Sequence, residues 1–212
     1  MLLYYITDRM QFAGDERSRR RTLLNKIAEA AACGIDLIQL REKDLPTHEL
    51  ESLSSAAIRL IREKSSKTRL LINSRTDIAI AIGANGIHLR SDDISPSDVR
   101  KTWSSGVGTS GRAKPVIAVS CHTTADVTRA AAEGADFAVF APVFEKRASP
   151  AVAAAGLSAL REACCAKIPV LALGGITLEN ARSCLEAGAA GIGGIRLFQD
   201  NDIATVVRLL RT

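Results

Sequence analysis

A repeat of about 50 residues runs through this chain and limits the folds open to it. Four times a helix-like segment ends at a glycine and is followed at once by a short apolar run; the glycines are Gly34, Gly83, Gly134 and Gly188. Because glycine tolerates the left-handed backbone conformation that closes many helices, each of them is expected to end a helix.

Further strand-like runs lie roughly midway between these units: Leu2–Ile6, Arg69–Ile72, Pro115–Val119 and Pro169–Leu173. Each repeat unit therefore holds two strand–helix modules, and four units give eight. Eight successive modules in 212 residues predict the α/β class and a single-domain TIM (β/α)8 barrel over residues 1–212. In this fold the active site lies on the loops that follow the strands.

Composition narrows the classes of partner. The net charge is +5, yet only 4% of residues are aromatic and none interleave with basic ones, so no nucleic acid is expected. No apolar run is long enough for a membrane span, and Met1 leads into a strand rather than a signal peptide. The five cysteines lack zinc-type spacing, which favours a cytoplasmic protein with reduced thiols; only Cys121, beside the fifth strand, lies near the expected site. The sequence does not decide the oligomeric state, and a homo-oligomer is one possibility.

Gln39, Arg41 and Lys43 alternate through the end of the second predicted strand and should project to one side, inward in a barrel. Two cations and an amide are costly to bury without an anionic partner. They predict a bound phosphate, diphosphate or carboxylate. The alternative is an internal salt bridge with Glu42 or Glu63.

The next strand ends carry further polar residues. The third strand ends in Asn73-Ser74, and Asp92-Asp93 follow the fourth. This acidic pair either holds magnesium or caps the helix that begins near Ser95-Pro96.

The fifth strand ends in Ser120-Cys121-His122. A neutral imidazole suits proton transfer near pH 7, so His122 is a candidate acid–base residue; a structural role is the alternative. The segment Phe144–Gly156 follows the sixth strand and is either a lid or an idle loop.

Glycine pairs follow the last two strands, Gly174-Gly175 and Gly193-Gly194, the latter continuing into Ile195-Arg196. The loops after strands seven and eight are the recurrent phosphate site of TIM barrels, where glycine lets backbone N–H groups approach the anion. A phosphate site is therefore predicted here, with structural tight turns as the alternative.

Six segments (YYITDR, QLREKDL, INSRTDIAIAIGANGIHLRSDDI, AVSCHT, FAPVF and ALGGIT) together resemble thiamine phosphate synthase and its sister, the thiazole tautomerase. The resemblance runs in order over nearly the whole chain. It implies a phosphorylated thiazole as a ligand and, for a synthase, hydroxymethylpyrimidine diphosphate as the second substrate, with diphosphate released.

The resemblance also implies roles for individual residues. Those that resemble the pyrimidine-diphosphate site are Gln39, Arg41, Lys43, Asn73 and Ser120, and Asp93 resembles a magnesium ligand. Those that resemble the thiazole-phosphate site are Gly174, Gly175, Gly194, Ile195 and Arg196.

Three departures from the synthase pattern favour the tautomerase. Ser74 stands where the second magnesium carboxylate belongs, Lys146-Arg147-Ala148-Ser149 replaces a Thr-x-Thr-Lys diphosphate loop, and Ile195-Arg196 replaces Val-Ser. Lys146 could take over from the missing loop lysine, and Arg196 could pair with the thiazole phosphate.

The resulting prediction is tautomerase-like proton transfer by His122, with Ser120 positioning the substrate and no cofactor. The alternatives are a synthase that uses Mg²⁺, with Asp93 as a weak or substrate-assisted ligand, and a non-catalytic binding or regulatory protein of thiamine biosynthesis.

Overall fold

Eight parallel strands close into a barrel in chain order, with β8 pairing back onto β1. The computed structural model describes residues 1–65, 67–105, 113–145 and 153–211. The strands are β1 (Leu2–Ile6), β2 (Leu37–Leu40), β3 (Arg69–Asn73), β4 (Gly86–Leu89), β5 (Val116–Cys121), β6 (Phe137–Phe140), β7 (Val170–Ala172) and β8 (Gly191–Gly194). The predicted TIM barrel is confirmed.

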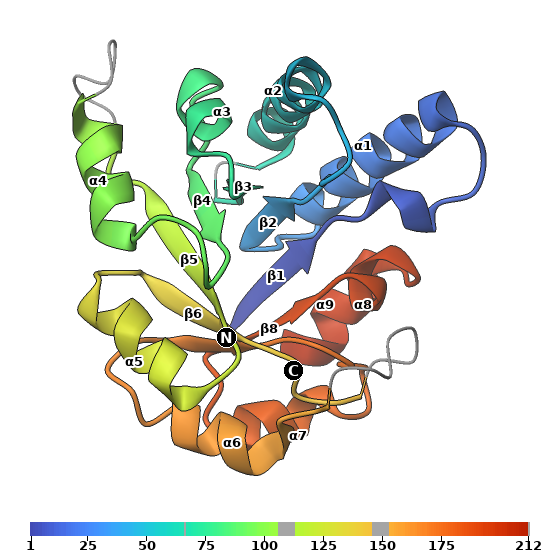
Figure 1. The fold of residues 1–212 in the computed structure, drawn as a ribbon. Helices are drawn as coiled ribbons and strands as arrows, with labels where there is room; N and C mark the ends of the chain where they lie inside the picture. The colour runs from blue at the N-terminus through green and yellow to red at the C-terminus, as the bar shows by residue number, and fades with distance from the viewer. Residues whose placement is uncertain (66, 106–112, 146–152, 212) are drawn as a thin grey trace.

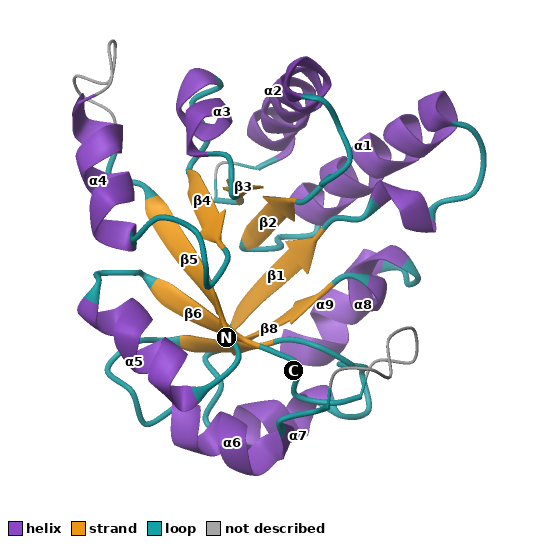
Figure 2. Ribbon diagram, viewed as in Figure 1, coloured by secondary structure: helices purple, strands orange, loops and turns teal. Residues whose placement is uncertain are grey.

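Helices surround the strands on the outside of the barrel, as Figures 1 and 2 show. They are α1 (Glu16–Ala32), α2 (Thr47–Lys64), α3 (Thr76–Ala81), α4 (Pro96–Ser105), α5 (Thr124–Ala132), α6 (Gly156–Ala163), α7 (Ala181–Glu186), α8 (Arg196–Gln199) and α9 (Ile203–Arg211). A 3-10 turn, η1 (Arg9–Gln11), precedes α1. Across the described ranges, no helix combines the length and apolar character that crossing a bilayer requires.

The four repeat glycines all have the expected left-handed backbone, with φ of 81°, 66°, 84° and 103° at Gly34, Gly83, Gly134 and Gly188. After α1, Gly34 N donates to the Ala31 carbonyl at 3.1 Å and Ile35 N donates to that of Ala30 at 3.0 Å. These two bonds define the Schellman motif, and the same pair recurs at the other three glycines. The repeat read from the sequence is thus a repeated helix C-terminus.

Alternation along the strands separates an inner core from an outer one. The side chains that fill the barrel interior are Tyr4, Ile6, Leu37, Leu71, Ala118, Phe137, Val139 and Leu171. The larger outer core lies between the strands and the helices. Two residues beyond Leu37, Leu71 and Ala118, the same inward side carries Gln39, Asn73 and Ser120. Polar groups therefore cap the apolar interior at the C-terminal ends of the strands.

Candidate active site

A chain of hydrogen bonds links the ends of β2 and β3 to the loop after β4. Gln39 Nε2 donates to Asn73 Oδ1 at 3.0 Å, and Asn73 Nδ2 donates to Ser74 Oγ at 3.2 Å. Ser74 Oγ in turn donates to Asp93 Oδ2 at 2.6 Å. The structure therefore brings together Gln39, Asn73 and Asp93, three of the residues selected from the sequence.

Asp93 does not cap the helix that follows it. Its Oδ2 also accepts from Arg90 N at 2.8 Å, which closes the loop after β4, and Asp92 pairs with the Arg90 guanidinium. At the start of α4, Ser95 Oγ accepts from Asp98 N at 3.2 Å instead. The capping alternative for the acidic pair is wrong, because the serine nearer the helix supplies the cap.

Arg41 and Lys43 form no ion pair within the described ranges. Glu42 turns the other way and is buried against Arg9 Nη1 at 3.1 Å and Thr7 Oγ1 at 2.6 Å. Burial raises the pKa of Glu42, while its hydrogen bonds to Thr7 and Arg9 act in the opposite direction. The internal salt bridge of Arg41 or Lys43 with Glu42 or Glu63 is therefore wrong.

The cations at this edge repel one another. The nearby charge of Arg41 is the main cause that lowers the pKa of Lys43; burial and then Arg90 add to it. Arg41 and Arg90 thus lie near Lys43 at this edge. Lys43 is exposed and Arg41 only half-buried, so the predicted burial of both cations is wrong. Because neither has a carboxylate partner in the described structure, their positive charge still favours an anion at this edge.

His122 follows β5 and has an exposed side chain with one fixed nitrogen. Its Nδ1 lies 2.7 Å from the Ala141 carbonyl oxygen. Since a carbonyl oxygen only accepts, Nδ1 carries the proton, and Nε2 of the neutral ring keeps a free lone pair. Cys121 is instead buried in the outer core, and burial raises the pKa of its thiol to about 12, so it is not part of the site.

His88 is a buried polar residue that the sequence analysis did not select. Its ring bridges Tyr4 Oη, 2.8 Å from Nδ1, and Ser120 Oγ, 2.7 Å from Nε2. Burial, and to a smaller extent the charge of Arg41, lower the pKa of His88 to about 3. The alternation in β4 was the available signal, since His88 shares a side with Gly86 and with the inward register of Ala118.

Packing requires glycine at Gly175 and Gly194, near the ends of β7 and β8. Gly174 and Gly175 have φ of 95° and 65°, and a Cβ on Gly175 would lie 2.6 Å from the Glu145 carbonyl oxygen. A Cβ on Gly194 would lie 2.8 Å from Leu197 Cβ. The tight-turn explanation thus has a direct physical basis.

The predicted phosphate site between these loops remains a prediction. Ile195 is half-buried, and Arg196, the first residue of α8, is exposed with no side-chain partner among the residues described. Lys146 and Arg147 lie outside the described residues.

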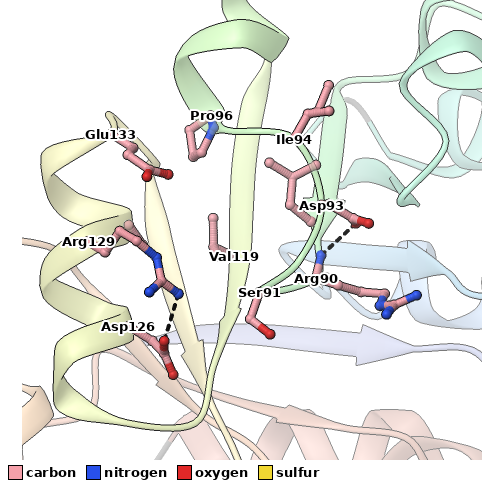
Figure 3. A pocket seen from close by; sticks show the side chains of 11 residues that line it. Arg90, Ser91, Asp93, Ile94, Pro96, Val119, Asp126, Arg129 and Glu133 are labelled. Carbon is pink, nitrogen blue, oxygen red and sulfur yellow. Dashed lines mark hydrogen bonds and ion pairs between the residues drawn. The ribbon is translucent and has the colours of Figure 1, made fainter.

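Neither of two cavities lies at the barrel mouth. A pocket of about 20 Å³, which Figure 3 shows between the loop after β4 and α5, is lined by Arg90, Asp93 and Arg129 among others. This volume suits about one water molecule, whereas ligand pockets typically exceed about 300 Å³. A larger cavity of about 590 Å³ lies at the opposite end of the barrel, beside Asn85 and Val116.

No group of three His, Cys, Asp or Glu side chains in residues 1–65, 67–105, 113–145 and 153–211 is placed to hold a metal ion. The acidic pair that the sequence offered as magnesium ligands, Asp92 and Asp93, is therefore not joined there by a third side chain of this kind. None of the five cysteines forms a disulfide.

Comparison with known proteins places the whole barrel in one group. The family model described as thiamine monophosphate synthase matches residues 3–198. The putative thiamine-phosphate synthase 2 of Aquifex aeolicus is 37% identical, covering 92% of this chain and 96% of the relative. The thiamine-phosphate synthase of Methanoculleus marisnigri is 35% identical, covering 99% and 93%.

A solved structure agrees with these relatives. Thiamine phosphate pyrophosphorylase from Pyrococcus furiosus superposes with a TM-score of 0.78 at 28% identity, covering 99% of this chain and 93% of that one. The chain belongs to the thiamine monophosphate synthase family and is an enzyme of thiamine biosynthesis.

Proposed function

We propose that this chain is a thiamine-phosphate synthase, which joins hydroxymethylpyrimidine diphosphate to hydroxyethylthiazole phosphate and releases diphosphate. The observation that carries the proposal is the pair of cations Arg41 and Lys43, which have no carboxylate partner among the described residues and follow Gln39, itself bonded to Asn73. A substrate with a polar ring and a diphosphate matches both halves of that arrangement. The names of the relatives support the same reaction.

This proposal reverses the preference drawn from the sequence, which was for the tautomerase. The synthase was the alternative there, and the comparisons favour it. The non-catalytic alternative is not retained, because the chain is an enzyme of the family.

In the proposed reaction the bond between the pyrimidine methylene carbon and the diphosphate oxygen breaks. A new bond forms between that carbon and the thiazole nitrogen, and the electron pair of the broken bond leaves with diphosphate. Arg41 and Lys43 would stabilise the charge that grows on the leaving group. Gln39 and Asn73, each fixed by the hydrogen bond between them, would hold the pyrimidine ring in position.

Members of this family typically use Mg²⁺. Asp93 Oδ2 is taken by Ser74 Oγ and Arg90 N, while Oδ1 accepts no hydrogen bond within the described structure. Because Mg²⁺ commonly binds through one or two carboxylates together with substrate phosphates and water, one free carboxylate oxygen fits an ion that arrives with diphosphate. Bound there, Mg²⁺ would neutralise part of the diphosphate charge.

The tautomerase is the second candidate, and His122 is the observation that favours it. With Nδ1–H fixed on Ala141, its Nε2 is ready to take a proton. Ser74 in place of a carboxylate is the second feature in its favour.

The deciding experiment supplies the purified protein with both synthase substrates and Mg²⁺, beside an assay of carboxythiazole tautomer conversion. Formation of thiamine phosphate and an equal amount of diphosphate is the expected result. The proposal would be overturned if no thiamine phosphate formed while tautomer conversion proceeded. In that case His122→Gln should slow conversion by about 10²-fold or more, as loss of a general acid–base does.

A further inference from the structure

The buried contact between Tyr4, His88 and Ser120 joins β1, β4 and β5 across the inside of the barrel. Tyr4 is fully buried and His88 is 3% exposed, whereas Ser120 is half-buried at the mouth. The Tyr4 and His88 rings are stacked with centroids 5.8 Å apart, and Phe137 packs edge-on against Tyr4 at the same distance. His88 and Phe137 therefore hold the Tyr4 ring from two sides.

The hydrogen bonds in this contact have one favourable direction. The His88 ring is neutral at ordinary pH, so one of its nitrogens donates and the other accepts. No other partner of the Tyr4 hydroxyl lies among the described residues. If Nδ1 donated to Tyr4, the hydroxyl hydrogen would be buried without an acceptor, which is costly.

Tyr4 therefore donates to His88 Nδ1, and His88 carries its proton on Nε2. That proton is donated to Ser120 Oγ. The hydrogen of Ser120 then has no acceptor in this contact, and it turns toward the mouth, where the proposed ligand lies. We propose that Tyr4 and His88 are positioning residues that fix Ser120 as a hydrogen-bond donor to an acceptor atom of the ligand.

This inference rests on the proposed function only in taking the ligand to lie at this mouth. It specifies the chemistry that Ser120 recognises: a ring nitrogen with a lone pair or a phosphate oxygen, but not an N–H group. The opposite tautomer of His88 would make Ser120 an acceptor. The buried tyrosine thus sets the polarity of a contact formed on the far side of the imidazole.

The first test reads the tautomer directly. Nitrogen-15 NMR of the full-length protein with labelled histidine, assigned by His88→Gln, should show the His88 proton on Nε2 at pH 7. A proton on Nδ1 would overturn the inference. This measurement needs neither ligand nor turnover, so it decides the inference even if the proposed function fails.

The second test is a double-mutant cycle with thiamine phosphate as the probe in calorimetric titrations. Tyr4→Phe keeps the ring and removes the hydroxyl, and it should weaken binding by about three- to tenfold, as loss of one hydrogen bond does. In a Ser120→Ala background the same change should have no further effect. An equal effect in both backgrounds would show that Tyr4 is merely structural.

Tyr5→Phe is the matched control. Tyr5 is the next residue of β1, is also buried, and donates to Gln199 Oε1 at 3.3 Å on the outer side of the barrel. Binding should be unchanged. If wild-type protein does not bind thiamine phosphate, the NMR result alone decides the role of His88, and the turnover assay still decides the proposed function.

Discussion

The two halves of the barrel mouth offer a ligand different kinds of hydrogen-bonding group. The ends of β2 to β5 carry side chains, among them Gln39, Arg41 and Asn73, which are linked or charged. The ends of β7 and β8 carry glycines, which have no side chain to offer, and the exposed Arg196 follows them. One half can change its chemistry by substitution, whereas the other depends on its backbone path.

This difference predicts how each half responds to mutation. In the side-chain half, substitution should alter binding or turnover while the fold persists. At Gly175, where a Cβ would lie 2.6 Å from a neighbouring carbonyl oxygen, substitution should alter stability first. A loss of function caused by changing Gly175 would therefore not by itself identify a phosphate site.

Arg41→Gln should have the largest effect. Removing a cation that stabilises a leaving diphosphate should lower kcat by roughly 10²–10³-fold, by analogy with the loss of one oxyanion donor. Steady-state release of diphosphate measures it. Arg182→Gln is the control, since Arg182 lies on α7 and pairs with Glu186 at 3.2 Å. A change of less than about threefold in Arg41→Gln would remove the cation pair from the mechanism.

Gly175→Ala should reduce the free energy of unfolding by roughly 3 kcal/mol, combining left-handed strain with overpacking. Gly193→Ala is the comparison: its Cβ would meet only ordinary contacts, the nearest being Leu173 Cδ1 at 3.5 Å. Urea unfolding should show a much smaller loss for Gly193→Ala. Equal losses would mean that the close approach to Glu145 does not limit this turn.

His88 should make stability depend on pH. Its pKa is lowered from 6.5 to about 3 in the folded protein, so protonation favours the unfolded chain. The contribution is complete above about pH 6.5 and is lost as the pH falls toward 3, by about 2 kcal/mol between pH 7 and pH 5. Urea unfolding at both values should show this loss, and His88→Gln should lack it. An equal loss of stability between pH 7 and pH 5 in both proteins would show that other groups cause it.

Ser74→Asp should have the smallest effect. Ser74 has a left-handed backbone, with φ of 56°, which aspartate tolerates better than most residues. A second carboxylate beside Asp93 should raise Mg²⁺ affinity, so that millimolar Mg²⁺ increases stability by about 1 kcal/mol more than in wild type. Thermal unfolding measures the difference, and Ser74→Asn is the uncharged control. An equal response of the Asp and Asn variants would exclude Asp93 as part of a metal site.

The sequence pattern predicted the structure best where local rules act alone. Four helix ends at glycine followed from backbone geometry, and the strand Leu2–Ile6 agrees residue for residue with β1. It failed where the outcome depends on which of several neighbours a side chain reaches. Asp93 was offered as a helix cap, but Ser95 occupies that role and Asp93 turns to Ser74.

The sequence by itself determined the order of the eight modules and the inward side of Gln39 at the end of β2, because both follow from chain-local periodicity. Only the tertiary structure decided which side chains form ion pairs and hydrogen bonds with one another. Glu42 pairs with Arg9, and Arg41 has no carboxylate partner in the part of the chain that the structure describes, although Glu42 is the next residue in the chain. Tyr4 and His88, 84 residues apart, meet because barrel closure brings β1 and β4 to one interior. Contacts of this kind depend on closure, which no local pattern records.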